Sequence, residues 1–295
     1  MENVPLARAN GIDIEYQTFG EPDGSPILLI AGLGVQMLSW DDGFCKLLAR
    51  RGFRTIRFDN RDSGLSTWID AAGPPDVAAA VSGDAHPAYQ LEDMAADAAG
   101  LLAALDIPAA HIVGSSMGGF IAQLVAINHP DRVLTLTSIM SGPSGRDQVA
   151  PSPDGAAVLL AAPPTTREER IAQGMWARRV LKGSLDPYDE HFELARVTLA
   201  VDRAYNPDGA ARQFIAVLAA QTRLERLSSV RVPTLVIHGL DDILVPVENG
   251  RLVASAVPGA RLLEIDGMGH DLPERVWSEV VDAIVDLAQQ TAVTR

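Results

Sequence analysis

The sequence has very little cysteine, with Cys45 as the single example among 295 residues. One thiol cannot form a disulfide within the chain, and it cannot supply the paired thiolates of a zinc finger or ribbon. The residues around Cys45 follow a helical pattern, so we interpret its side chain as a buried structural thiol. The composition therefore favours a fold held together by its core rather than by covalent or metal cross-links.

Basic residues are also scarce. The chain has 24 Lys and Arg against 38 Asp and Glu, which gives a formal net charge of −14. Nucleic-acid binding needs basic patches that displace counterions from phosphates. The densest basic stretches here are two pairs, Arg50 with Arg51 and Arg178 with Arg179. These pairs are too short for such a patch, and we expect no nucleic-acid partner.

Long apolar runs are missing as well. No uninterrupted apolar stretch reaches the ~20 residues that span a bilayer, and the opening MENVPLARANG lacks the basic-then-apolar order of a secretory signal. We therefore expect no membrane partner and a cytoplasmic location. Hydrophobic residues nevertheless make up 47% of the chain against 21% charged residues, which is enough for a large core.

Short stretches rich in apolar residues recur along the chain, as in strands that are buried on both faces of a sheet. They lie at residues 26–31, 55–58, 111–113, 133–139, 234–237 and 262–265. Residues 6–9 and 12–19 instead alternate apolar and polar side chains, which is typical of half-exposed strands. Gly11 between them fits a tight turn. We expect this pair to form an antiparallel hairpin at one edge of the sheet.

Helical patterns separate the apolar runs, at residues 41–50, 91–105, 120–128 and 276–287. Because strands and helices alternate, we predict an α/β fold with a mostly parallel sheet flanked by helices on both faces.

The alternation stops between residues 143 and 229. This segment begins with Ser, Pro and Gly and then has helical patterns with large apolar side chains. Open α/β sheets bind ligands at the carboxyl edge of their strands. We therefore interpret residues 143–229 as a helical cap, and residues 1–142 with 230–295 as the core domain. The alternative is a surface insertion with a small core of its own.

A candidate nucleophile lies in the sequence Gly-Ser-Ser-Met-Gly at residues 114–118, which matches the pattern G-x-S-x-G. The match directly follows a predicted buried strand and directly precedes a predicted helix. This strand–turn–helix context is that of a nucleophile elbow, which holds its serine in a strained backbone conformation. The register of the pattern selects Ser116 over its neighbour Ser115.

A serine hydroxyl needs an adjacent base to act as a nucleophile. Among six histidines, His270 lies in the Gly-rich loop Gly-Met-Gly-His-Asp-Leu-Pro between the last predicted strand and the last helix. We take His270 as the base. We interpret three other histidines as structural because they lie at the ends of predicted strands or helices: His111, His129 and His238. His86 and His191 lie in a loop and in the cap, and they could contact a substrate.

The base needs a carboxylate that fixes its tautomer. The candidates are Asp241 and Asp242, which directly follow the predicted strand 234–237. Residues 132–146, at and beyond the preceding core strand, contain no Asp or Glu that could replace them. On spacing alone both aspartates remain open.

An oxyanion hole needs two backbone N–H groups that point at the developing charge. One should come from Met117, which follows the nucleophile at the start of a helix. For the other we choose Leu33, because Gly32 and Gly34 on either side let the loop fold toward Ser116. The same glycines could simply turn the chain.

The whole chain resembles the α/β-hydrolase superfamily in four motifs that occur in the family's order. They are Ala-Gly-Leu-Gly at 31–34, Gly-Ser-Ser-Met-Gly-Gly at 114–119, Gly-Leu-Asp-Asp-Ile-Leu-Val-Pro at 239–246 and the histidine loop at 267–273. In the register of the resemblance, Asp242 is the acid, and Asp241 could serve only if the loop were shifted by one residue. The order Ser116, Asp242, His270 is also that of α/β-hydrolases.

One further segment resembles a particular branch of this family. Residues 58–66, Phe-Asp-Asn-Arg-Asp-Ser-Gly-Leu-Ser, are similar to the family loop Asp-x-Arg-Gly-x-Gly-x-Ser, except that Asp62 stands where most members have glycine. This variant resembles the branch that contains aclacinomycin methylesterase, an ester hydrolase of polyketide glycosides. Ala31 departs from the histidine that many relatives have before the oxyanion glycine.

The resemblance implies a serine carboxylesterase of the methylesterase type that needs no cofactor. A lactonase, a C–C bond hydrolase of the meta-cleavage type and a haloperoxidase-type perhydrolase remain open on the same fold. From another class, a hydrolase-like ligand receptor remains open too. Ser116 argues against haloalkane dehalogenases and epoxide hydrolases, which have aspartate at the elbow.

Nucleotide and metal motifs are missing. No Walker loop or G-x-G-x-x-G stands at a strand–helix junction, and no H-E-x-x-H or similar cluster is present. We expect neither a cofactor nor a catalytic metal. The cap has large apolar side chains and few positions for binding a charged group, so we expect a small neutral hydrophobic ester as substrate.

Overall fold

The computed structural model describes residues 5–185 and 187–293. Eight strands form one sheet in the order β1-β2-β4-β3-β5-β6-β7-β8. The strands are β1 (Leu6–Ala9), β2 (Ile12–Phe19), β3 (Ser25–Ile30), β4 (Phe53–Phe58), β5 (Ala110–Ser115), β6 (Val133–Ile139), β7 (Thr234–Gly239) and β8 (Arg261–Ile265). β1 and β2 are antiparallel at one edge and the other six strands are parallel, which confirms the predicted fold class.

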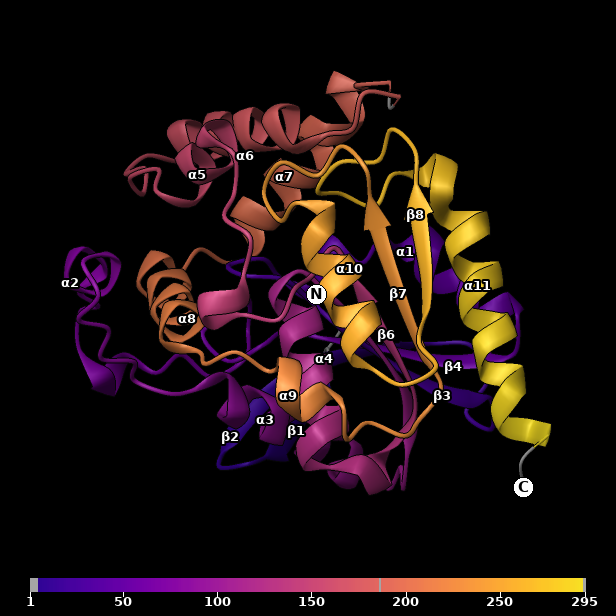
Figure 1. The fold of residues 1–295 in the computed structure, drawn as a ribbon. Helices are drawn as coiled ribbons and strands as arrows, with labels where there is room; N and C mark the ends of the chain where they lie inside the picture. The colour runs from indigo at the N-terminus through magenta and orange to yellow at the C-terminus, as the bar shows by residue number, and fades with distance from the viewer. Residues whose placement is uncertain (1–4, 186, 294–295) are drawn as a thin grey trace.

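Helices cover both faces of the sheet (Figure 1). One core lies under α3 (Leu91–Ala104), α4 (Met117–Asn128) and α10 (Val247–Ala256), and the other lies under α1 (Asp42–Arg50) and α11 (Glu274–Val293). Alternate residues of β3 enter the two cores: Leu28 and Ile30 enter the first, while Ile27 and Leu29 enter the second. This burial on both faces explains why the central strands read as continuous apolar runs.

The segment between β6 and β7, residues 143–229, contains five α-helices among its described residues, and we call it the cap segment. The helices are α5 (Pro153–Leu159), α6 (Arg167–Leu181), α7 (Glu190–Arg203), α8 (Pro207–Ala219) and α9 (Leu224–Leu227). Figure 1 shows α5, α6 and α7 beyond the arrowheads of β7 and β8, at the carboxyl edge of the sheet. The short helix α2 (Val77–Val81) packs beside α8 although it precedes β5 in the chain.

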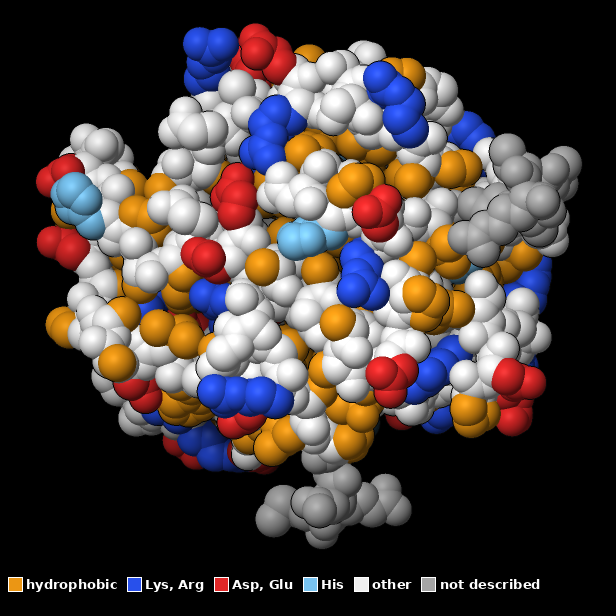
Figure 2. All heavy atoms as spheres, turned by 90° about the horizontal axis from the view of Figure 1, so that it is seen from below, with side chains coloured by type: hydrophobic (Ala, Val, Ile, Leu, Met, Phe, Trp, Pro, Cys, Tyr) orange, Lys and Arg blue, Asp and Glu red, His pale blue; other side chains and the backbone are white. Residues whose placement is uncertain are grey.

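The surface mixes charge and apolar groups. On the face shown in Figure 2, Lys and Arg side chains are separated from one another by neutral and acidic ones. None of the helices in residues 5–185 and 187–293 combines the length and the apolar composition that crossing a bilayer requires.

Candidate active site

Ser116 lies in a sharp turn between β5 and α4, with φ 56° and ψ −123°. A positive φ is strained for a residue with a side chain, and such strain is concentrated at functional sites. Side chains at the flanking glycines would prevent the turn. A Cβ on Gly114 would lie 1.9 Å from the carbonyl oxygen of Gly118, and one on Gly118 would lie 2.1 Å from that of Ile30. The sequence pattern therefore reflects a steric requirement.

His270 lies between the other two candidate residues of the triad. Its Nε2 is 3.0 Å from the Oγ of Ser116, and its Nδ1 is 2.8 Å from an Oδ of Asp242. An ionised carboxylate can only accept hydrogen bonds, so Nδ1 is the protonated nitrogen. Nε2 is then the acceptor for the Ser116 hydroxyl. This is the tautomer that a general base requires.

Asp242 is held in place by the backbone of its own loop. Its second Oδ accepts hydrogen bonds from the N–H groups of Leu244 (2.9 Å) and Val245 (2.8 Å). Burial alone would raise the pKa of Asp242, but the charge of His270 and the hydrogen bonds from His238, His270 and Val245 outweigh it and bring the pKa well below its usual range. The side chain is fully buried yet stays ionised.

Asp241 points elsewhere. One of its carboxylate oxygens accepts a hydrogen bond of 2.8 Å from the backbone N–H of Ser184 in the cap segment. Hydrogen bonds from the Ser184 hydroxyl and from this backbone N–H lower the pKa of Asp241. Of the two aspartates that the sequence left open on spacing, Asp242 is the one that the structure brings to His270.

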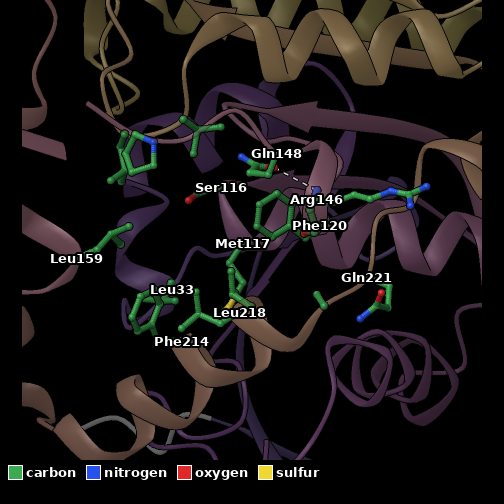
Figure 3. Close-up of a pocket in the computed structure, with 17 residues that line it drawn as sticks. Leu33, Ser116, Met117, Phe120, Arg146, Gln148, Leu159, Phe214, Leu218 and Gln221 are labelled. Atoms are coloured by element: carbon green, nitrogen blue, oxygen red, sulfur yellow. Dashed lines mark hydrogen bonds between the residues drawn. The ribbon is translucent and has the colours of Figure 1, made fainter. Parts of the chain in front are cut away.

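Leu33 and Met117 both line the pocket beside Ser116 (Figure 3). The loop after β3 passes directly over Ser116, since a Cβ on Gly32 would lie 3.3 Å from the Cβ of Ser116. Within the described residues, the backbone N–H groups of Leu33 and Met117 donate no hydrogen bond to the protein. Met117 is also the first residue of α4, where the helix dipole favours negative charge.

The pocket has a volume of about 430 Å³, and its wall is mostly apolar. Figure 3 shows Leu33 and Phe214 on one side, with Arg146 and Gln221 at the other end. The cap segment supplies much of the wall, including Leu159, Phe214 and Leu218. Among the described residues, no group of three or more His, Cys, Asp or Glu side chains is arranged to hold a metal ion.

Two buried contacts between the core and α8 were not predicted. The Asp62 carboxylate accepts hydrogen bonds from Arg212 at 2.9 and 2.8 Å, and both side chains are almost completely buried. Gln213 contacts the loops after β3 and β4. The sequence contained one sign of the contact with Arg212, namely that Asp62 stands where most family members have glycine. With φ 65°, Asp62 has the left-handed backbone that favours glycine.

His238 is buried directly beside Asp242. Its Nε2 lies 2.6 Å from the carbonyl oxygen of Val245 and 3.4 Å from an Oδ of Asp242. The sequence predicts a structural histidine at this position, and its contacts are with the loop that contains Asp242. His111 in β5 is buried as well, between the side chains of Ser25 and Thr135.

Comparisons with known proteins agree with this architecture. Residues 25–274 match the family described as alpha/beta hydrolase fold. The chain is 34% identical over 284 residues to rhodomycin D methylesterase DnrP of Streptomyces peucetius, which covers 90% of this chain and 91% of that protein. The branch resemblance seen in residues 58–66 is thereby confirmed.

Solved structures of related hydrolases have the same fold. The enol-lactonase from Burkholderia xenovorans LB400 superposes with a TM-score of 0.74 at 25% identity, covering 97% of this chain and 100% of that one. A meta-cleavage product hydrolase from Pseudomonas fluorescens IP01 superposes with a TM-score of 0.76 at 18% identity, with 97% of each chain covered. The family match, the methylesterase relative and the sheet topology together show that this chain belongs to the α/β hydrolase family.

Proposed function

We propose that this protein is a serine carboxylesterase that works through an acyl-enzyme intermediate. The observation that carries the proposal is the continuous hydrogen-bonded chain from Asp242 through His270 to Ser116, with distances of 2.8 and 3.0 Å. This is the geometry by which a carboxylate orients a base and the base activates a nucleophile. The methylesterase relative at 34% identity supports ester cleavage as the reaction.

The reaction proceeds in two halves. Ser116 Oγ attacks the ester carbonyl carbon while His270 Nε2 takes its proton, and His270 then gives that proton to the departing alcohol. Water, deprotonated by the same nitrogen, cleaves the acyl-enzyme and restores the Ser116 hydroxyl. The N–H groups of Leu33 and Met117 stabilise the negative oxygen in both halves, each by about 3 kcal/mol.

The pocket supports a neutral hydrophobic ester as substrate. Its apolar wall, which includes Met117, Phe120 and Phe214, favours burial of an uncharged acyl group. In this proposal residues 143–229 act as the cap that completes the binding site over a core of residues 1–142 and 230–295. Because a methylesterase is among the relatives, we include a bulky acid esterified with methanol among the substrates.

A serine-directed fluorophosphonate probe tests the proposal. We expect the probe to label Ser116, as located by mass spectrometry, and we expect Ser116→Ala to lose both labelling and turnover of p-nitrophenyl butyrate. Ser115→Ala is the matched control, because its hydroxyl is one residue away and outside the hydrogen-bonded chain. Turnover that survives in Ser116→Ala would contradict the proposal. A wild-type protein that turned over neither esters nor lactones would favour a ligand receptor instead.

A further inference from the structure

Gln213 of α8 connects the cap segment to two loops of the core. Its side-chain carbonyl oxygen accepts a hydrogen bond of 2.8 Å from the backbone N–H of Gly34, and its amide nitrogen donates one of 2.8 Å to the backbone carbonyl of Arg61. The side chain has no exposed surface. A buried amide with both ends satisfied is held in one orientation, because breaking either bond leaves a polar group without a partner.

The bond to Gly34 acts on the loop that carries Leu33. Gly34 has φ 68°, so its backbone conformation is one that few other residues adopt. Its N–H belongs to the peptide unit directly after Leu33, so fixing this unit restricts the direction in which the Leu33 N–H points. Leu33 itself makes no backbone hydrogen bond within the described residues that could set this direction.

A second cap contact holds the same loop further along. The side-chain amide of Gln36 donates to the carbonyl oxygens of Ala200 (2.7 Å) and Ala204 (2.9 Å), at the end of α7. On the core side, Asn60 donates a hydrogen bond of 3.0 Å to the carbonyl of Ala31. The loop after β3 is therefore held between the core and the cap segment, and the bond from Gln213 is made to the residue directly after Leu33.

The position of Gln213 is itself well determined. Its neighbour Arg212 forms the buried ion pair with Asp62. The side chain of Asn206, just before α8, donates a hydrogen bond of 3.2 Å to the backbone carbonyl of Asp62. α8 is thus attached to the loop after β4 by two residues that precede Gln213 in the chain.

We propose that Gln213 is a positioning residue for the oxyanion hole, which sets the direction of the Leu33 N–H through Gly34. This inference rests on the proposed function, since it assumes that Leu33 stabilises an oxyanion. In this arrangement the cap segment covers the substrate and also completes the catalytic geometry. A group that acts only in the transition state changes kcat and leaves substrate binding in the ground state largely unchanged.

The test compares three variants. Gln213→Met has a similar size but loses both hydrogen bonds, while Gln213→Glu keeps an acceptor for the Gly34 N–H. Asn206→Ala is the control, because it loosens α8 without touching the oxyanion loop. A misplaced catalytic group can cost about 100-fold in rate, so we expect Gln213→Met to lower kcat by about 10- to 100-fold with KM within about 2-fold of wild type.

Two further readouts separate positioning from a merely structural role. Affinity for a trifluoromethyl ketone, which forms a tetrahedral oxyanion on the serine, should fall by the same factor as kcat/KM in Gln213→Met. Hydrogen exchange of the peptide containing residues 32–36 should become faster in the same variant. We expect Gln213→Glu to recover part of the kcat.

The outcomes distinguish this inference from the proposed function. Normal kcat and normal hydrogen exchange in Gln213→Met, in a protein whose Ser116 is labelled and required, would overturn the role of Gln213 alone. Equal losses in Asn206→Ala and Gln213→Met would also overturn it, because the effect would then come from loosening α8. Faster exchange at residues 32–36 in a protein without esterase activity would leave the contact standing and refute the proposed function.

Discussion

At the scale of single residues, the two adjacent aspartates after β7 differ in what they contact. Asp242 accepts a hydrogen bond from His270 Nδ1, and Asp241 accepts one from the Ser184 backbone. In Asp242→Asn an amide would face Nδ1 and favour the wrong tautomer of His270. We expect kcat to fall by about 10⁴-fold, as for the corresponding change in a serine protease.

Asp241→Asn is the matched control for this prediction, because it makes the same chemical change one residue away. We expect its kcat on p-nitrophenyl butyrate to stay within about 3-fold of wild type, since an amide oxygen can still accept from Ser184. Circular dichroism checks that both variants are folded. A large loss in Asp241→Asn with a mild one in Asp242→Asn would show that another conformation of this loop is the active one.

The buried ring of His111 should make the stability of the folded protein depend on pH. Its ring is buried in β5, and burial lowers its pKa from 6.5 to about 4. Between these two values the unfolded chain binds a proton at this histidine and the folded chain does not, so stability falls as the pH drops. Between pH 7 and pH 5 the loss from this one group should be about 2 kcal/mol.

Urea unfolding of His111→Gln at pH 7 and pH 5 checks this prediction. The variant should lose less stability on acidification than wild type, whatever its stability at pH 7. His191→Gln is the control, because it makes the same substitution at a histidine that is exposed on the cap segment. Identical pH dependence in His111→Gln and wild type would show that His111 is protonated in the folded state as easily as in the unfolded one.

At the scale of secondary-structure elements, the Asp62–Arg212 pair joins the loop after β4 to α8. Both side chains are buried, and Asp62 also accepts hydrogen bonds from the hydroxyl of Tyr89 and the N–H of Ile69. Arg212→Met leaves the carboxylate buried without its cation, which should cost about 3 kcal/mol. The double variant Asp62→Gly/Arg212→Met removes both charges. Its free energy of unfolding should fall by no more than that of Arg212→Met alone, since glycine suits the positive φ of position 62.

Urea denaturation of the two single variants and the double variant measures this coupling. Arg251→Met serves as the control, because the Arg251–Glu264 pair is exposed and such pairs contribute at most about 1 kcal/mol. If the double variant loses as much free energy of unfolding as the two single variants together, the buried pair does not couple α8 to the core.

Sequence patterns identified those strands and helices whose burial shows in the spacing of apolar residues along the chain. β6 was predicted with its observed bounds, because it is covered on both faces and consists only of apolar residues and the small hydroxyl residues Thr and Ser. α10 was missed: Asn249 and Gly250 interrupt its apolar face, and Gly250 is small because a Cβ there would lie 2.4 Å from Nδ1 of His238. α4 begins at Met117 and not at residue 120, since Gly118 and Gly119 hide its helical pattern.

Some residues of the candidate site could likewise be identified from local sequence, and others could not. Ser116 and His270 were identifiable because each lies in a short motif at a strand end, where the chemistry dictates the neighbouring glycines. Gln213 lies in no such motif. It contacts Gly34 across 179 residues of sequence, and no local spacing reports a contact of that kind. Such positioning contacts become visible only once the elements are placed in space.

At the scale of the whole molecule, the cap segment is attached to the core around the site. Besides the contacts of α8, Arg203 at the end of α7 forms ion pairs of 2.7 Å with Glu15 and Asp59 in the core. Near the candidate base, the N–H of His270 donates a hydrogen bond of 2.8 Å to the carbonyl of Leu181 at the end of α6. The cap segment and the rest of the chain therefore both line the pocket, and both contact the loops that contain Leu33 and His270.

This shared pocket predicts a substrate preference. Its wall is mostly apolar and the chain has a net charge of −14, so a second carboxylate on the acyl group would lose its hydration and meet a repulsive field. We expect higher kcat/KM for p-nitrophenyl esters with neutral short or medium acyl chains than for dicarboxylate half-esters. We also expect hydrolysis of a bulky anthracycline-type methyl ester.

A graded series of p-nitrophenyl esters, assayed beside that methyl ester, measures this preference. Arg146 is the informative control, because it lines the far end of the pocket and is a cation that an anionic acyl group could reach. In the proposed pocket, Arg146→Gln should leave kcat/KM for the neutral esters within about 3-fold of wild type, since apolar contact dominates their binding. A preference for anionic esters that Arg146→Gln abolishes would mean that the cation, and not the apolar wall, selects the substrate.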